Sequence, residues 1–290
     1  MERLLDAEWF KLRKRMMTWV LALILVGLVV LLYSILWSTS SRVARFGEEN
    51  RFTGIDLRQA LFLPGAVPYS LQIVGTFGVI LAVILAAGSI GSEYAWGTVR
   101  LVATAASGRI RWLSAKLLIV IGLTAVGALL AVAAALTYST LIAAYYGDLS
   151  ASFLTATFVR DQAEAYGRTL FVIMPYLTLS FAMAVVFRST LAGVGSGMGF
   201  AFAEPLIDGL MNAAGRPWDK VPNYLLNTNR QVILLQNKLP EVLPRFGGGR
   251  GQVSGALTPP EAGLVLALYT VAFIAIAFFV FRRRDISSGQ

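Results

Sequence analysis

The sequence predicts an all-α integral membrane protein with six transmembrane helices and both termini in the cytoplasm. Two observations lead to this fold class. The 290 residues are 57% hydrophobic and only 14% charged, with a mean hydropathy of +0.68, far more apolar than a soluble domain. Six apolar stretches also reach the roughly 20 residues that a helix needs to cross a hydrocarbon core of about 30 Å. We expect a single transmembrane domain over residues 1–290.

The predicted spans cover residues 17–37, 69–90, 117–145, 169–187, 191–210 and 262–281. The third is longer than one straight perpendicular span needs, so it should tilt or project beyond the bilayer. Only Arg188, Ser189 and Thr190 separate the fourth from the fifth. This spacing favours a tight helical hairpin with a cationic tip over one long bent helix. The long segment 211–261 is then an outer loop.

The positions of Lys and Arg predict the orientation. Positive charges precede the first span, lie between the second and third spans, and follow the last span at Arg282, Arg283 and Arg284. Such clusters mark cytoplasmic ends. The formal net charge of +9 therefore points to anionic lipid headgroups and not to nucleic acid. We expect a multi-pass protein of the cytoplasmic (inner) membrane of a prokaryote.

The composition also limits the chemistry of the chain. With no Cys and no His, it has no disulfide, thiol nucleophile, Cys/His zinc site or imidazole base. Ser196 misses the Gly-x-Ser-x-Gly pattern of a nucleophile elbow by one position. We therefore predict no catalytic residue, no metal site and no cofactor in this chain.

The N-terminal segment 2–15 places Leu5, Trp9 and Leu12 on one stripe among charged residues. This pattern predicts an amphipathic helix on the inner membrane surface, with Trp9, Lys11 and Arg13 as its interfacial residues. The alternative is a basic flank that only sets the orientation of the first span.

Two shorter loops are expected on the outer side. In the first, 38–68, the apolar patch 61–63 should lie against the membrane face. The second, 146–168, mixes acidic and basic residues and should form a solvated cap.

The long outer loop contains apolar residues at helical spacing, namely Leu225, Leu226, Val232, Ile233, Leu235 and Leu239. They predict a surface helix that packs on the outer membrane face. After this loop, Thr258, Pro259 and Glu261 form a capping box that opens the last span.

The inner loop between the second and third spans has the most informative pattern. Gly88 and Gly91 should loosen the exit from the second span. One helical face would then carry Glu93, Trp96, Gly97 and Arg100, and the other Tyr94, Thr98 and Leu101. A short helix of this character, outside the bilayer, suits a groove on a soluble partner. The alternative is an ordinary solvated loop.

The fifth span combines small and acidic residues. One face carries Gly193 and Gly197 and another Gly195 and Gly199, which allows close approach of helices; packing is the simpler role, and a hinge or dimer seam the alternative. Near the outer end, Glu204 and Asp208 lie one turn apart. A solvated vestibule explains them simply, and a gate in a transport pathway is the alternative.

Taken in order, these segments resemble the type-2 ABC exporter permease family. The likeness rests on the basic start Glu8-Trp-Phe-Lys-Leu-Arg-Lys, the Leu63-Pro-Gly stretch, the segment Gly91-Ser-Glu-Tyr-Ala-Trp-Gly-Thr-Val-Arg, and the Arg-rich approach to Lys116. The resemblance implies that residues 91–101 are the coupling helix, which docks on an ATPase subunit, and that residues 2–15 are the connecting helix beside it.

The resemblance also implies partners. The chain contains no Gly-x-x-x-x-Gly-Lys-Ser/Thr phosphate loop, so a separate ATPase subunit would bind ATP and Mg. The expected assembly has two such subunits and two permeases, either a homodimer or a pair with a related permease. The chain itself would be a transport subunit and not an enzyme. An ion-gradient-driven secondary transporter is the alternative, with Glu204 and Asp208 as its coupling acids.

Overall fold

The computed structural model describes residues 2–46, 61–99, 108–147, 154–215, 217–237 and 257–283. Every regular element within these ranges is helical, which confirms the predicted all-α class. The elements are α1 (Glu2–Arg13), α2 (Met16–Phe46), α4 (Ala66–Ala95), α6 (Arg109–Tyr146), α7 (Ala156–Phe187), α8 (Thr190–Ala214), the 3-10 helix η1 (Trp218–Tyr224), α9 (Leu226–Leu234) and α10 (Pro259–Arg283).

Five of these helices are long and apolar enough to cross a membrane, namely α2, α4, α6, α7 and α10. The chain is therefore a multi-pass membrane protein. The fifth predicted span does form a helix, α8, but it is not among these five. Six spans accordingly stay a prediction.

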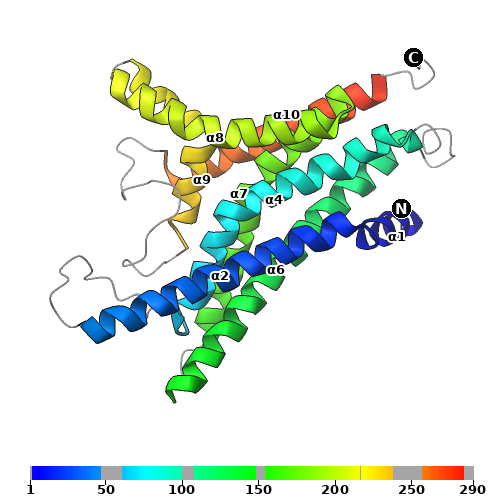
Figure 1. The fold of residues 1–290 in the computed structure, drawn as a ribbon. Coiled ribbons are helices and arrows are strands. Elements are labelled where there is room, and N and C mark those ends of the chain that lie inside the picture. The colour runs from blue at the N-terminus through cyan, green and yellow to red at the C-terminus, as the bar shows by residue number, and fades with distance from the viewer. Residues whose placement is uncertain are drawn as a thin grey trace.

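Helices α4 and α7 form the centre of the bundle. In their most apolar windows 72% and 67% of the residues are buried, against 22% for α2, 22% for α6 and 17% for α10. Figure 1 shows α4 and α7 between α2 and α6 on one side and α8 and α10 on the other. The outer helices therefore turn much of their apolar surface away from the protein, as hydrocarbon contact requires.

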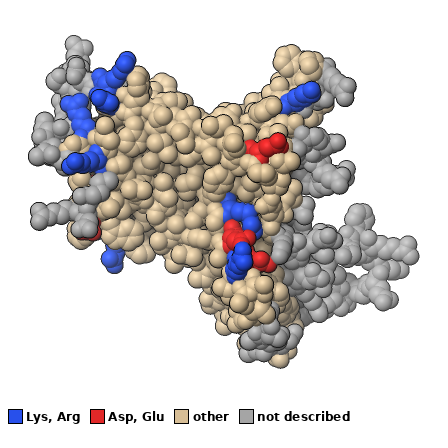
Figure 2. Space-filling model, turned by 180° about the vertical axis from the view of Figure 1, so that it is seen from behind, with Lys and Arg blue, Asp and Glu red and all other residues tan. Residues whose placement is uncertain are grey.

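The surface supports this interpretation. Leu23 of α2, Leu141 of α6 and Leu268 of α10 are 68%, 66% and 60% exposed. On the face in Figure 2, Lys and Arg gather at the left edge, a mixed charged group lies in the right half, and a broad band between them carries no charge. An uncharged belt between two polar rims suits a bilayer.

Several helices extend further than the predicted spans. α2 continues to Phe46, and α6 has 38 residues, or about 57 Å, so it projects beyond the hydrocarbon core as expected. The second outer loop was predicted wrongly in part, because residues 156–168 belong to α7. Helix formation there satisfies the backbone and pairs Arg160 with Glu164 one turn away, at 3.0 Å.

The short turn between α7 and α8 confirms the predicted hairpin. α7 ends at Phe187, and Arg188 adopts a left-handed conformation with φ 53°. Ser189 then caps α8, since its side chain accepts a hydrogen bond from the Ala192 amide. The Ser180 hydroxyl donates to the Gly193 carbonyl at 3.0 Å, so α8 returns along α7.

The two glycine faces of α8 differ. A Cβ atom at Gly193 would lie 2.8 Å from the Cβ atoms of Ala87 and Ala184, and one at Gly197 would lie 2.7 Å from Val83. At Gly195 and Gly199, a Cβ would meet nothing within 4 Å in the described part of the chain. Within this chain, the first face therefore serves close packing against α4 and α7.

This difference predicts the effects of two substitutions in one helix. Gly193→Val should destabilise the bundle by about 1–3 kcal/mol, because its side chain overpacks the contact with α4 and α7. Gly195→Val carries the same helix-propensity change without that clash and is the control. The measurement is the free energy of unfolding of each variant in detergent. Equal losses for the two variants would mean that close packing at Gly193 is not the cause.

The surface helix predicted in the long outer loop forms as α9, but its position differs from the prediction. It packs against α7 and α10 and buries Leu226 and Ile233, so it lies among the helices of the bundle and not on the outer membrane face. Leu235 is 40% exposed, and Leu239 lies outside the described residues. Likewise Leu61, from the patch expected at the membrane face, is only 1% exposed and belongs to the protein core.

The start of α10 is as predicted. The Glu261 carboxylate accepts hydrogen bonds from the backbone amide of Thr258 at 2.8 Å and from its hydroxyl at 2.7 Å. Pro259 occupies the first helical position, where its missing N–H costs nothing.

Candidate functional site

The most developed polar site lies where α1, α4 and α6 meet, at the end of the bundle that also contains the C-terminal end of α10 (Figure 1). We call it the Glu93 cluster, and it consists of Glu8, Lys11, Arg15, Glu93, Thr98 and Lys116. It unites three segments that are far apart in the sequence.

Helix α4 delivers Glu93 because it continues without interruption to Ala95. Gly88 and Gly91 were expected to loosen this part of the chain, but they serve close packing. A Cβ at Gly88 would lie 2.5 Å from the Met17 sulfur, and one at Gly91 would lie 2.6 Å from the Thr190 Cα. These two glycines let α2 and the start of α8 approach the α4 backbone.

The Glu93 carboxylate is fully buried and contacts three cations through one oxygen. Its Oε1 lies 2.6 Å from Lys11 Nζ, 2.9 Å from Arg15 Nη2 and 3.2 Å from Lys116 Nζ. Its Oε2 accepts a hydrogen bond from the Thr98 hydroxyl. Both oxygens are thus engaged, as a buried carboxylate requires.

Lys116 joins a second carboxylate to the cluster. Its ammonium group, also fully buried, lies 2.7 Å from Glu8 Oε2, and the Trp112 indole N–H donates to Glu8 Oε1 at 3.0 Å. The ring of Phe281, near the end of α10, stacks on Trp112 at 5.7 Å between centroids. One helix end from each of α1, α4, α6 and α10 therefore meets here.

The charges in the cluster do not balance completely, since three cations face two carboxylates. Lys11 is 34% exposed and Arg15 is 12% exposed, so the excess positive charge lies at the solvent side. Arg15 also donates to the Ser92 hydroxyl at 2.7 Å and lies 4.9 Å from the centre of the Trp96 ring. The arrangement can hold α1, α4 and α6 as one unit.

The residues predicted to contact an ATPase subunit divide into three groups. The Glu93 side chain was expected on the docking surface, but the structure buries it within the chain. Trp96, 63% exposed, and Gly97, with φ 69°, do form an exposed turn after α4, beside the partly buried Tyr94 and Thr98. Arg100 and the end of the predicted short helix lie outside the described residues.

The predicted interfacial residues of α1 also have different roles. Lys11 belongs to the Glu93 cluster, whereas Trp9 is 38% exposed and Arg13 is exposed. The face of α1 that packs on the protein carries Glu8 and Leu12. The helix is thus amphipathic as predicted, but its buried stripe includes an acid.

A second buried carboxylate, Glu204, lies toward the opposite end of the bundle. Its Oε1 accepts from the Leu226 amide at 2.6 Å, and its Oε2 accepts from the Asn227 amide at 3.0 Å and the Tyr176 hydroxyl at 2.7 Å. Arg230 lies 5.9 Å from the centre of the Tyr176 ring. Glu204 therefore caps the first turn of α9 from a different helix.

Asp208 does not join Glu204. It is partly exposed and accepts a hydrogen bond at 2.8 Å from Asn212, one turn further along α8. The two acids predicted as a gate or pathway pair are therefore separated by their partners. Glu204, with both oxygens engaged and no exposed surface, has the geometry of a helix cap.

Several residues of these sites were not predicted as site residues from the sequence, namely Glu8, Arg15, Trp112, Lys116, Tyr176 and Arg230. One signal was available for Glu8, because its spacing places it on the same stripe as Leu5 and Leu12, where an acid needs a buried partner. Lys116 at the start of an apolar span was a second such signal. Nothing in the sequence pairs Tyr176 with Glu204.

Among the described residues, no group of three or more His, Cys, Asp or Glu side chains could hold a metal ion. No curated protein matches the chain. Residues 60–287 match a family described as "Protein of unknown function (DUF2705)". This match spans α4 to α10 and includes Glu93, Lys116 and Glu204, and the chain belongs to the DUF2705 family.

Proposed function

We propose that the chain is the membrane-spanning permease subunit of an ATP-driven ABC transporter, an exporter that couples to a separate ATPase subunit. In this proposal α8 is the sixth span, both termini are cytoplasmic, and two permeases work with two ATPase subunits in the cytoplasmic membrane. The proposal rests on the order of the sequence segments that resemble type-2 ABC exporter permeases.

The observation that supports it most is the Glu93 cluster. An exposed turn at Trp96 and Gly97 follows Ala95, the last residue of α4, and the cluster beneath it ties that turn to α1 and α6. A push on the turn would move these helices together, because the buried ion pairs that join them are costly to separate. Such a joint suits an element that transmits a movement of an ATPase subunit.

In this geometry the proposed contact with the ATPase subunit lies at a different place from the one predicted from the sequence. The docking surface would be the exposed turn, with Trp96 as its centre, and Glu93 would position that turn from below. A large aromatic side chain in such a place is a frequent centre of binding energy. The secondary-transporter alternative needs coupling acids open to water. Glu204 is buried with both oxygens engaged, and Asp208 is only partly exposed and hydrogen-bonded to Asn212.

Trp96→Ala should reduce copurification of the chain with the proposed ATPase subunit by about tenfold, through loss of the central contact. Trp218→Ala is the matched control, because Trp218 is similarly exposed, at 54%, in η1 after the far end of α8. The measurements are the ratio of the two subunits after purification and the ATPase activity in nanodiscs. Equal recovery with both variants would argue against the docking surface.

Sidedness is tested separately. Because the chain has no Cys, Ala95→Cys introduces a single label site. An impermeant maleimide should label it in inverted membrane vesicles and not in intact cells. Labelling from outside the cell would contradict the proposed function.

A further inference from the structure

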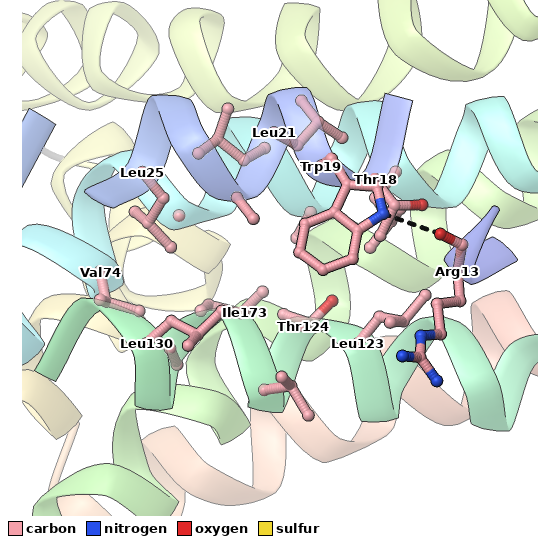
Figure 3. A pocket seen from close by; sticks show the side chains of 18 of the residues that line it. Arg13, Thr18, Trp19, Leu21, Leu25, Val74, Leu123, Thr124, Leu130 and Ile173 are labelled. Carbon is pink, nitrogen blue, oxygen red and sulfur yellow. Dashed lines mark hydrogen bonds between the residues drawn. The ribbon is translucent and has the colours of Figure 1, made fainter. Parts of the chain in front are cut away.

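An apolar groove with a volume of 340 Å³ opens between α2, α4 and α6 (Figure 3), a size within the range of ligand pockets. Its walls include Leu21 and Leu25 of α2, Leu81 and Leu85 of α4, and Leu123 and Leu130 of α6. At its rim, Trp19 is 55% exposed and Leu130 43% exposed. The groove therefore opens sideways, toward the surface that faces hydrocarbon.

The size of the groove limits what it can hold. From Thr18 to Leu25 on α2, and from Leu123 to Leu130 on α6, it extends for about 10 Å along the helices. This is about two thirds of one leaflet of the hydrocarbon core. A transmembrane helix crosses about 30 Å of hydrocarbon, so most of its length would lie outside a groove this short. One acyl chain is a better match.

The polar atoms of the groove are concentrated at one end. Thr18 and Thr124 donate their hydroxyl protons to carbonyls of nearby residues, at 2.8 and 2.9 Å. The Trp19 indole N–H donates to the Arg13 carbonyl at 2.8 Å. These three donors are therefore already engaged in hydrogen bonds within the protein and are not free to bind a guest. The middle of the groove offers a guest little but apolar contact.

The Arg13 side chain is different. Among the described residues that line the groove, Arg13 alone carries a charge, and in the described part of the chain no carboxylate forms an ion pair with it. Figure 3 shows Arg13 and Trp19 at one end of the groove, with Leu25, Val74 and Leu130 toward the other. An unpaired guanidinium at the mouth of an apolar slot is complementary to a phosphate on an acyl chain.

We propose that this groove binds one acyl chain of an anionic glycerophospholipid from the leaflet on the α1 side, with its phosphate at Arg13. Arg13 is the last residue of the polar helix α1, and the apolar helix α2 begins three residues later at Met16, so its side chain lies at headgroup level. Trp19 has the position of an interfacial aromatic residue. The proposal does not depend on the ABC transporter assignment.

Native mass spectrometry of the full chain in detergent tests it with two probes, phosphatidylglycerol and phosphatidylcholine with the same acyl chains. Wild type should retain one molecule of phosphatidylglycerol in preference to phosphatidylcholine. Arg13→Gln should lower phosphatidylglycerol retention about tenfold and abolish the preference. Arg111→Gln removes an exposed charge from the same end of the bundle, outside the groove, and should retain the lipid as wild type does.

A second pair of variants tests the slot itself. Gly127→Leu fills the groove, and its Cβ would come no closer than 3.9 Å to Leu25, so the fold should tolerate it. It should lose retention of both lipids. Gly122→Leu in the same helix, where a Cβ meets nothing within 4 Å, is the control. If Gly127→Leu does not fold, Ala22→Leu narrows the groove from α2.

Two results would overturn the proposal. Full lipid retention by a folded groove-filling variant would place the bound lipid elsewhere. Equal retention of the two lipids, unchanged in Arg13→Gln, would identify an apolar guest without headgroup recognition.

Discussion

Glu93→Gln should destabilise the folded chain by about 3–5 kcal/mol, the loss expected when one partner is removed from a buried ion pair. After the substitution, Glu8 is the one carboxylate left to pair with the fully buried Lys116. The positive charges of Lys11, Arg15 and Lys116 then lie close together without the negative charge that they shared. The free energy of unfolding, from denaturant titration in mixed micelles, measures the effect.

Glu164→Gln is the control for this experiment. Glu164 also pairs with two cations, Arg160 and Arg168, but its side chain is 48% exposed, and such pairs contribute about 0–1 kcal/mol. Similar losses for Glu93→Gln and Glu164→Gln would show that the buried cluster does not hold the helices together. The docking proposal would then lose its positioning element.

Glu204→Gln should release α9 from the bundle. Both carboxylate oxygens accept hydrogen bonds, and the amide nitrogen of glutamine would face a donor, such as the Leu226 or Asn227 amide. A buried donor left without a partner costs about 1–3 kcal/mol. Asp208→Asn, in the same helix and partly exposed, should change stability by less than about 0.5 kcal/mol.

The state of α9 can be followed directly. Thr228 is 3% exposed, and its hydroxyl oxygen is buried without a hydrogen-bond partner, so Thr228→Cys removes no hydrogen bond that the structure describes. Maleimide should react with this cysteine faster in the double variant with Glu204→Gln than in the Thr228→Cys variant alone. Equal labelling rates would mean that Glu204 does not hold α9 in place.

The sequence predicted where helices form better than where they end. Long apolar runs identified α2, α4, α6, α7 and α10, and the Arg188 turn between α7 and α8 was also correct. Hydropathy ceases to be informative where a helix leaves the hydrocarbon. The extension of α7 back to Ala156 therefore went unpredicted, because its residues are polar although their backbone is helical.

The errors around Glu93 have a related cause. A helical repeat shows which residues share a face, but not whether that face meets water, a partner or another part of the chain. Glu93 and Trp96 were assigned to one exposed face, and only Trp96 is exposed. Gly88 and Gly91 were interpreted through backbone freedom, while the structure uses their lack of a side chain. Only tertiary contacts separate these alternatives.

The buried position of α9 sets an order of events during biosynthesis. Its first turn binds Glu204 of α8, which in turn binds Tyr176 of α7, and both helices are translated before residue 226. The backbone amide of Asn227, a nearly inaccessible residue, gains its acceptor Glu204 only once α8 is in place. α10, synthesised last, packs against α9 and closes the structure over it. Nascent chains that stop before α10 should therefore leave α9 open to protease.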